Sequence, residues 1–141
     1  MATEGGEVNN RPVITGLGQL HVSVTDLDRA VAWYRDVLGL DFLFQVPGQP
    51  MAFFNCGGVR LYLGVPENES FRSRPIMYFS VDDIDRSVEE IANRGGQFSD
   101  RPHVVHRDDS SELWLASLTD PEGTPVLLME ARPISASTAH S

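Results

Sequence analysis

Hydrophobic and polar residues alternate just before each of two helix-like patterns. Leu20, Val22 and Val24 alternate with polar residues, and this period of two predicts a strand with one face on a core. The stretch Ser23–Val31 then opens an amphipathic helical pattern. A closely similar stretch, Ser80–Val88, opens another after a second strand-like run. The sequence therefore predicts two copies of one structural unit.

Each unit is predicted to consist of a strand, a helix and further strands. Asp26 is expected to cap the first helix through its carboxylate, and Gly39 to end it. The first unit then comprises a strand at 17–24, a helix at 27–38, and further strands at 40–46, 51–56 and 59–64. The second comprises the strand 75–81, the helix 83–94, a short strand at 97–102, a polar loop at 103–111, and a hairpin at 112–118 and 124–130.

This order of elements predicts an α+β fold. Two tandem βαβββ modules would form an open, curled mixed sheet around a cleft, with helices on the outer faces. Leu20, Val22 and Val24 would then pack under a helix, as would Met77 and Phe79. A single domain is expected at 14–132, with module one at 14–64, a linker at 65–74 and module two at 75–132. The N-terminal tail 1–13 and the C-terminal tail 133–141 are expected to be flexible.

Composition narrows the classes of partner and the compartment. The chain has 141 residues and a formal charge of −9, which argues against nucleic acid or an anionic membrane surface as the main partner. The one cysteine, Cys56, excludes an intrachain disulfide and favours the cytoplasm. Residues 1–11 lack the features of a signal peptide, and no apolar stretch approaches the roughly 20 residues of a membrane span.

Three motifs resemble the vicinal oxygen chelate superfamily, which includes glyoxalase I, extradiol dioxygenases and bleomycin-resistance proteins. They are Val24–Leu40, Val81–Ile84 and Thr119–Gly123, within a similarity that covers roughly residues 15 to 132. The resemblance implies the same two-module fold and a cleft that binds a small molecule. It also implies a homodimer, because dimers in this superfamily commonly complete or flank the cleft.

The resemblance further implies a divalent metal, held by one residue from the first and one from the last strand of each unit. The matching positions here are Gln19, Tyr62, Ile76 and Leu127. An amide, a phenol and two aliphatic side chains do not form a ligand set for a divalent cation. We therefore expect no metal cofactor.

The side chains that alternate with the core positions are predicted to line the cleft. His21 is a candidate general base, the alternative being a polar lining residue without a catalytic role. Trp114 would stack on a flat ligand or pack in the core or an interface. The predicted ligand-binding set is Gln19, His21, Arg60, Tyr62, Ile76, Tyr78, Trp114, Leu127 and Met129.

A second polar cluster, His103, His106 and Glu112 with the aspartates between them, could hold a metal of its own or form a lid over the cleft. The spacing of these residues matches no metal-binding motif, so a solvated loop is the simpler interpretation. Nothing near Cys56 in the sequence would lower the pKa of its thiol, which is expected to be inert.

Three functions are compatible with these features. The first is a bleomycin-resistance-like protein that binds an apolar or aromatic small molecule without metal. The alternative is an enzyme of the same superfamily, a lyase, isomerase or dioxygenase, that uses an unforeseen metal site or His21 as acid or base. The third is a regulatory or interaction domain with a vestigial cleft.

Overall fold

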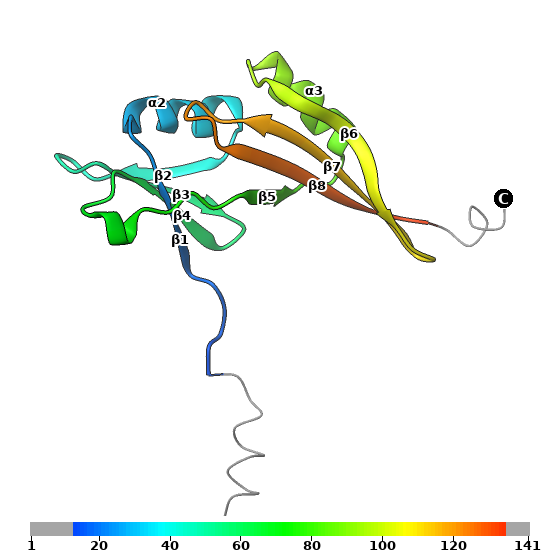
Figure 1. Cartoon of the computed structure of the whole chain (residues 1–141), viewed down its shortest axis with the longest axis horizontal. Helices are drawn as coiled ribbons and strands as arrows, with labels where there is room; N and C mark the ends of the chain where they lie inside the picture. Colours follow the sequence, from blue (N-terminus) through cyan, green and yellow to red (C-terminus); the bar gives the residue numbers. More distant parts are fainter. Residues whose placement is uncertain (1–12, 135–141) are drawn as a thin grey trace, which may run out of the picture.

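The computed structural model describes residues 13–134 and contains two four-stranded sheets (Figure 1). Sheet A has the order β1-β4-β3-β2 and sheet B the order β5-β8-β7-β6. The strands are β1 (Gln19–Ser23), β2 (Asp41–Gln45), β3 (Met51–Cys56), β4 (Val59–Gly64), β5 (Met77–Ser80), β6 (Phe98–Arg107), β7 (Ser111–Thr119) and β8 (Pro125–Pro133). In each sheet the first strand runs parallel to the last strand of its module, and the other pairs are antiparallel. The prediction of two tandem βαβββ modules is confirmed.

One helix follows the first strand of each module. Asp26 caps α2 (Leu27–Ala32), and Asp83 caps α3 (Ile84–Asn93). The first helix was predicted to continue as one α-helix to residue 38. Its last part is instead a π-helical turn, η1 (Trp33–Val37), in which Leu38 N–H donates to the carbonyl of Trp33. A short 3₁₀ turn, η2 (Glu69–Phe71), interrupts the linker.

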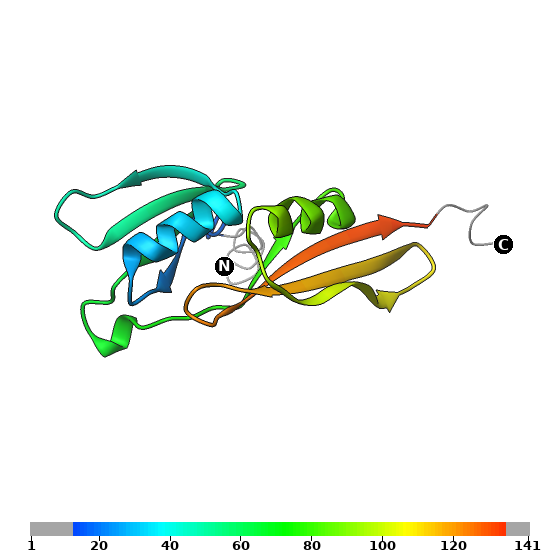
Figure 2. The same cartoon turned by 90° about the horizontal axis from the view of Figure 1, so that it is seen from above.

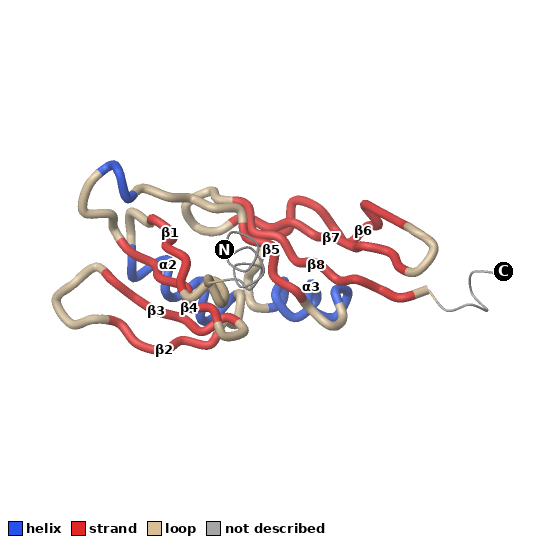
Figure 3. Tube along the Cα trace, turned by 90° about the horizontal axis from the view of Figure 1, so that it is seen from below, coloured by secondary structure: helices blue, strands red, loops and turns tan. Residues whose placement is uncertain are grey.

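Both helices cover the same side of the two sheets, and the core lies between helices and strands (Figures 2 and 3). Val22, Val24 and Met77 are buried there, and Leu20 and Phe79 pack against them, as the alternation predicted. The opposite side of each sheet has no helix over it. We call these two surfaces the open face of sheet A and the open face of sheet B. No helix among residues 13–134 is long and apolar enough to cross a membrane.

The polar loop predicted at 103–111 is wrong, because β6 continues to Arg107 and β7 begins at Ser111. The β6–β7 hairpin extends past α3, so most side chains of β6 are exposed on both faces and carry no alternation of polarity (Figure 2). Irregular register between β6 and β7 disturbs the period further. The start of the tail predicted at 133–141 is also wrong, because Pro133 ends β8 and Ile134 N–H donates to the carbonyl of Ser110. Residues 1–12 and 135–141, which make up most of the two predicted tails, lie outside the described residues.

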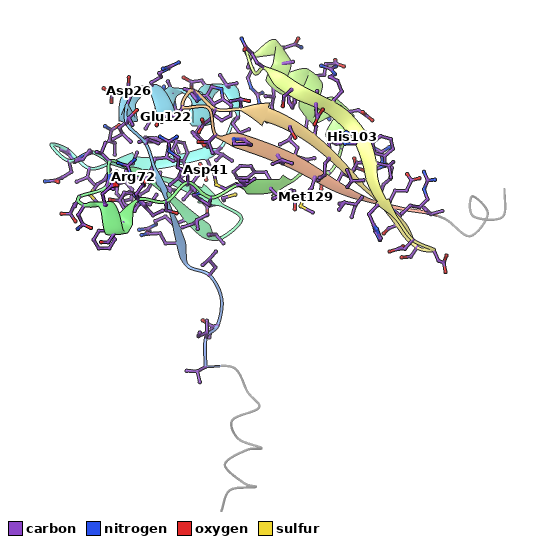
Figure 4. All side chains as sticks on the ribbon, viewed as in Figure 1. Asp26, Asp41, Arg72, His103, Glu122 and Met129 are labelled. Carbon is purple, nitrogen blue, oxygen red and sulfur yellow. The ribbon has the colours of Figure 1, made fainter. Side chains whose placement is uncertain are left out.

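Glu122, in the turn between β7 and β8, joins the second module to the first. Its carboxylate accepts hydrogen bonds from the backbone N–H groups of Thr25 (2.6 Å) and Asp26 (3.0 Å), at the start of α2. Figure 4 shows Asp26 and Glu122 beside each other on these two elements. Arg74 forms an ion pair with the same carboxylate, at 3.3 Å. The first helix is therefore capped partly by the other module.

We predict that Glu122→Gln destabilises the protein by about 1–2 kcal/mol at neutral pH. Burial acts to raise the pKa of Glu122, but the hydrogen bonds from Asp26 and Thr25 and the charge of Arg74 outweigh it, and the pKa is lowered from 4.5. A carboxyl group with a lowered pKa in the folded state stabilises the fold above its unfolded pKa, and that contribution is lost as the pH falls through the folded pKa.

The measurement is urea unfolding of wild type and variant between pH 3 and pH 7. The difference in unfolding free energy should be fully present above about pH 5 and shrink toward pH 3. Glu89→Gln is the matched control, because Glu89 is exposed on α3 and has no ion pair in the described chain. A difference that does not change with pH would contradict the prediction.

Candidate ligand-binding site

Four aromatic side chains form one row across the open face of sheet A. His21, Tyr62, Phe53 and Phe44 are direct cross-strand partners on β1, β4, β3 and β2. The ring centroids of Tyr62 and Phe53 are 4.9 Å apart with 24° between the planes, and those of Phe53 and Phe44 are 4.9 Å apart with 32°. His21 meets Tyr62 edge-on at 4.6 Å. We call this set the aromatic row.

The rings of the aromatic row stand on the sheet rather than lie flat on it. Nearly parallel rings with centroids 4.9 Å apart cannot be coplanar without clashing, so Tyr62, Phe53 and Phe44 face one another along the row. The edges of the less buried rings, Tyr62 and Phe44, therefore point to the space above the sheet. Because aromatic edges carry positive partial charge, they attract the negative face of another flat ring.

Phe53 is buried, at 6% exposure, although it lies outside the main core. Its neighbours Ala52 and Phe54 point to the helix side, so Phe53 points to the open face. There it is covered by Tyr62, by Phe44 and by Arg60, whose Cζ lies 5.5 Å from the Phe53 ring centroid. The open face of sheet A therefore has a small packed layer of its own.

Gly64 provides the space in which the Tyr62 ring lies. A Cβ added at Gly64 would lie 2.6 Å from Cε1 of Tyr62 and 3.0 Å from its hydroxyl oxygen. The ring thus leans along β4 over residue 64. This close approach sets the position of the central ring of the aromatic row.

We predict that Gly64→Ala lowers the unfolding free energy by about 1 kcal/mol and displaces Tyr62. In a Tyr62→Ala background the same substitution should have no such effect, because the ring that it meets is gone. Urea unfolding of the two single variants and the double variant measures this coupling. An equal loss in both backgrounds would show that residue 64 is restricted by something other than Tyr62.

A cavity of about 390 Å³ opens beside the aromatic row. One wall comes from the sheet, with Gln19, His21 and Tyr62, and the other from segment 66–73, with Phe71. Ser73 holds this segment on β1, since its N–H donates to the Ser23 hydroxyl at 2.8 Å. A volume of this size suits a small organic molecule.

His21 is held in one orientation by Ser23. The Ser23 hydroxyl is buried, accepts from Ser73 N–H and shares a hydrogen bond with His21 Nε2, 3.1 Å away. His21 Nδ1 is buried without a hydrogen-bond partner in the described chain. Burial lowers the pKa of His21, so the imidazole is neutral at pH 7. His21 can therefore line the site as an uncharged side chain, and its Nε2 is already hydrogen-bonded with Ser23.

The predicted residues of module two lie on the open face of sheet B, with one exception. Tyr78 is opposite Leu127, and Met129 lies two residues further along β8, on the same face. Ile76, just before β5, and Tyr78 are more than half exposed. Figure 4 places Met129 on β8 and His103 on β6.

Trp114 is the exception, because the structure does not bring it together with the other predicted residues. It points to the helix side of sheet B and packs against the core. The Arg132 guanidinium carbon lies 4.3 Å from its ring centroid, and its Nε1 donates to Glu112 at 3.1 Å.

The family's four metal-ligand positions do not fit a divalent cation. Gln19 and Tyr62 lie on the open face of sheet A, and Ile76 and Leu127 belong to sheet B. None supplies a carboxylate or an imidazole. Across residues 13–134 there is no group of three or more His, Cys, Asp or Glu side chains close enough to hold a metal.

The side chains of the second polar cluster have other partners. His103 Nδ1 lies 2.8 Å from the carbonyl oxygen of Arg101, His106 lies 3.8 Å from Asp108, and Glu112 pairs with Arg107. These residues belong to β6, β7 and the turn between them, and they are largely exposed. Burial raises the pKa of the Cys56 thiol, in keeping with an unreactive cysteine.

Phe44 and Phe53 belong to the site, and the sequence reasoning missed both. Phe53 lies within the apolar run Met51–Phe54, where alternation of polarity gives no sign of which side chains face the helices. Pairing β2 with β3 about the turn at Pro47–Gly48 could have set aromatic residues opposite each other. That step also needs the register, which is irregular between Phe42 and Phe44.

Comparison with known proteins agrees with this fold. Two βαβββ modules with a helix-free face on each sheet define a class of small proteins. Residues 16–128 match the model of the Glyoxalase/Bleomycin resistance protein/Dioxygenase superfamily, and the chain belongs to that superfamily.

Individual relatives share part of the chain or its fold. Metallothiol transferase FosB of Staphylococcus epidermidis is 34% identical over 77 residues, 52% of this chain and 54% of that protein, so the chain spans about half the length of the curated relatives it matches. Lactoylglutathione lyase of Agrobacterium tumefaciens is 26% identical with a TM-score of 0.64, covering 83% of this chain and 94% of that one. TnmS3, an antibiotic binding protein from Streptomyces sp. CB03234, is 20% identical with a TM-score of 0.65, covering 86% and 99%.

Proposed function

We propose that this chain binds a flat, aromatic or apolar small molecule on the open face of sheet A, in the cytoplasm and without a divalent metal. The aromatic row is the observation that supports this proposal most directly. Packed rings with a cavity beside them offer a ligand apolar contact and edge-to-face aromatic contact. The fold accommodates such a role, since TnmS3 is an antibiotic binding protein with the same fold.

The chemistry of the donor set supports a site that needs no metal. The positions at which superfamily enzymes carry metal ligands here hold Gln19, Tyr62, Ile76 and Leu127. A single neutral amide oxygen does not hold a divalent ion against water. The ring of Tyr62 instead contributes to the apolar surface.

The proposal includes a homodimer. Large hydrophobic side chains are exposed on both open faces, Phe44 on sheet A and Ile76 and Tyr78 on sheet B. A second copy would remove them from water and close the cleft over the bound molecule. Light scattering on the full chain should give the mass of two chains, and the mass of one chain at micromolar concentration would contradict the dimer.

Calorimetric titration with a panel of flat ring systems, in buffer containing a chelator, tests the binding function. Saturable binding of at least one member with a dissociation constant at or below about 100 μM is expected. Metal content is measured in parallel, after dialysis against Zn²⁺, Ni²⁺, Mn²⁺ or Fe²⁺ and washing. Retention of about one ion per chain, or binding that appears only with metal, would contradict the metal-free site.

A second candidate function is catalysis by His21, favoured by its position as a neutral imidazole beside the cavity. The FosB relative is named as a transferase. To act as a base through Nε2, His21 would have to release its hydrogen bond with the Ser23 hydroxyl. Turnover of a bound ligand that is lost in His21→Gln, with binding retained, would move this candidate to first place.

A further inference from the structure

A polar row lies next to the aromatic row on the open face of sheet A. Gln19, Arg60, Asn55 and Asp41 are direct cross-strand partners on β1, β4, β3 and β2. Each of the first three precedes or follows a member of the aromatic row by two residues. Two residues of a strand span about 7 Å, which is the width of two or three fused rings. A flat molecule lying on the aromatic row therefore has an edge above the polar row.

Arg60 is the charged centre of this polar row, and no carboxylate of residues 13–134 lies within ion-pair distance of it. Six other arginines of the described chain pair with acids, namely Arg35, Arg72, Arg74, Arg86, Arg107 and Arg132. Arg29, Arg94 and Arg101 do not, but they lie on α2, at the end of α3 and on β6, so Arg60 is the arginine without an acid on the open face of sheet A. The acid of the same row, Asp41, lies two strands away, about 10 Å, with Asn55 between them. In a chain of net charge −9, an arginine left without an acid is available to an outside anion.

The guanidinium group of Arg60 is also held in place by neighbouring rings. Its central carbon lies 5.5 Å from the Phe53 ring centroid and 5.9 Å from that of Phe44. Contact with these rings restrains the group above the row while its N–H donors remain open to solvent, because Arg60 is exposed. A guanidinium presented in this way suits the two oxygens of a carboxylate.

We propose that the molecule bound on this face is a flat aromatic acid, whose rings lie across the edges of Tyr62 and its neighbours and whose carboxylate is bound by Arg60. This inference rests on the proposed function and names its ligand class. The positive ring edges and the guanidinium favour the same kind of partner, an electron-rich ring system with an anionic group. Gln19 and Asn55 flank Arg60 and offer amide N–H groups to the same carboxylate.

Two compounds with the same ring system, one anionic and one neutral, test the inference. Anthracene-2-carboxylate and anthracene-2-carboxamide share an electron-rich ring system and size, and both are titrated calorimetrically into the full chain at pH 7.5. Wild type should bind the acid about 10- to 100-fold more tightly than the amide. Arg60→Gln should abolish that preference and change the affinity for the amide less than about threefold, and Arg60→Lys should keep part of it.

Arg101→Gln is the matched control, since Arg101 is an exposed arginine on β6 that also lacks an ion pair in the described chain; it should leave both affinities unchanged. Thermal unfolding of each variant checks the fold, because Arg60 covers Phe53. Equal binding of acid and amide by wild type would overturn the inference and leave the proposed function standing. An equal loss of both ligands in Arg60→Gln would also overturn it, since the residue would then act by packing. Binding of neither compound, nor of any other flat ring system, would overturn the proposed function itself.

Discussion

Replacing Asp120 by alanine is expected to lower the free energy of unfolding by about 3–5 kcal/mol. Asp120 is only 5% exposed and accepts three hydrogen bonds. The Tyr34 hydroxyl donates to one carboxylate oxygen at 2.9 Å, and the N–H groups of Glu122 and Thr124 donate to the other at 2.9 Å each. Alanine would leave these buried donors without an acceptor. The contact also joins the two modules, because Tyr34 belongs to the first helix and Asp120 to the β7–β8 turn.

Tyr34→Phe removes the hydrogen bond between the modules and keeps the hydrogen bonds within the turn, so it measures the contribution of the first to stability. Burial, and then the neighbouring Asp120 carboxylate, raise the pKa of Tyr34, so its hydroxyl remains a donor at all ordinary pH values. Removing this hydroxyl should lower stability by about 1.5–3 kcal/mol, as for a hydrogen bond to a charged group. In the Asp120→Ala background the same change should have little further effect.

Urea unfolding by circular dichroism measures all of these variants at pH 7. Asp109→Ala is the control, since Asp109 is an exposed acid in the turn between β6 and β7; it should change stability by less than about 0.5 kcal/mol. A loss below about 1 kcal/mol for Asp120→Ala would mean that water or a shifted turn satisfies the same donors.

Tyr62→Ala should lower the affinity for a flat aromatic ligand about 10- to 100-fold. The substitution removes the ring that lies between His21 and Phe53, and with it the main apolar surface that sheet A contributes to the cavity. Tyr62→Phe is the matched control. It keeps the ring and its packing, so its affinity should stay within about threefold of wild type.

Calorimetry with one ligand of the panel measures both variants, after circular dichroism has shown that each is folded. Retained affinity in Tyr62→Ala would place the ligand elsewhere, for example in the cavity between the modules that Cys56 and Tyr78 help to line. Loss of affinity in Tyr62→Phe as well would show that the hydroxyl, rather than the ring, is what the ligand recognises.

Much of the architecture could be predicted from local patterns. The repeated strand-to-helix stretch, with Asp26 and Asp83 at the caps, marked two modules, because capping and periodicity depend on neighbours in the chain. Alternation placed Val22 and Met77 under the helices for the same reason. His21 and Tyr62 were expected on a common face, and they are cross-strand partners.

The faces of sheet B could not be assigned in this way. In β7 and β8, both alternating sets are apolar: Leu115 and Met129 on the open face, Ala116 and Leu128 on the helix side. A strand that is hydrophobic on both sides gives no preference from its own sequence. This is why stacking of Trp114 on a ligand and packing of Trp114 in the core both stood open, and the structure places the side chain on the helix side of sheet B, against the core.

The sequence by itself determined the two-module repeat, the helix caps and the core face of the first strand of each module, because each depends on residues a few positions apart. The expectation that the chain holds no divalent metal rests on the residue types at the positions that the family resemblance implies, and it stays a prediction. Only the tertiary structure decided the register across four strands, and with it the aromatic row, the polar row beside it and the unpaired position of Arg60. These sets join residues of β1, β2, β3 and β4, and they exist only once strand pairing brings distant segments to a common face.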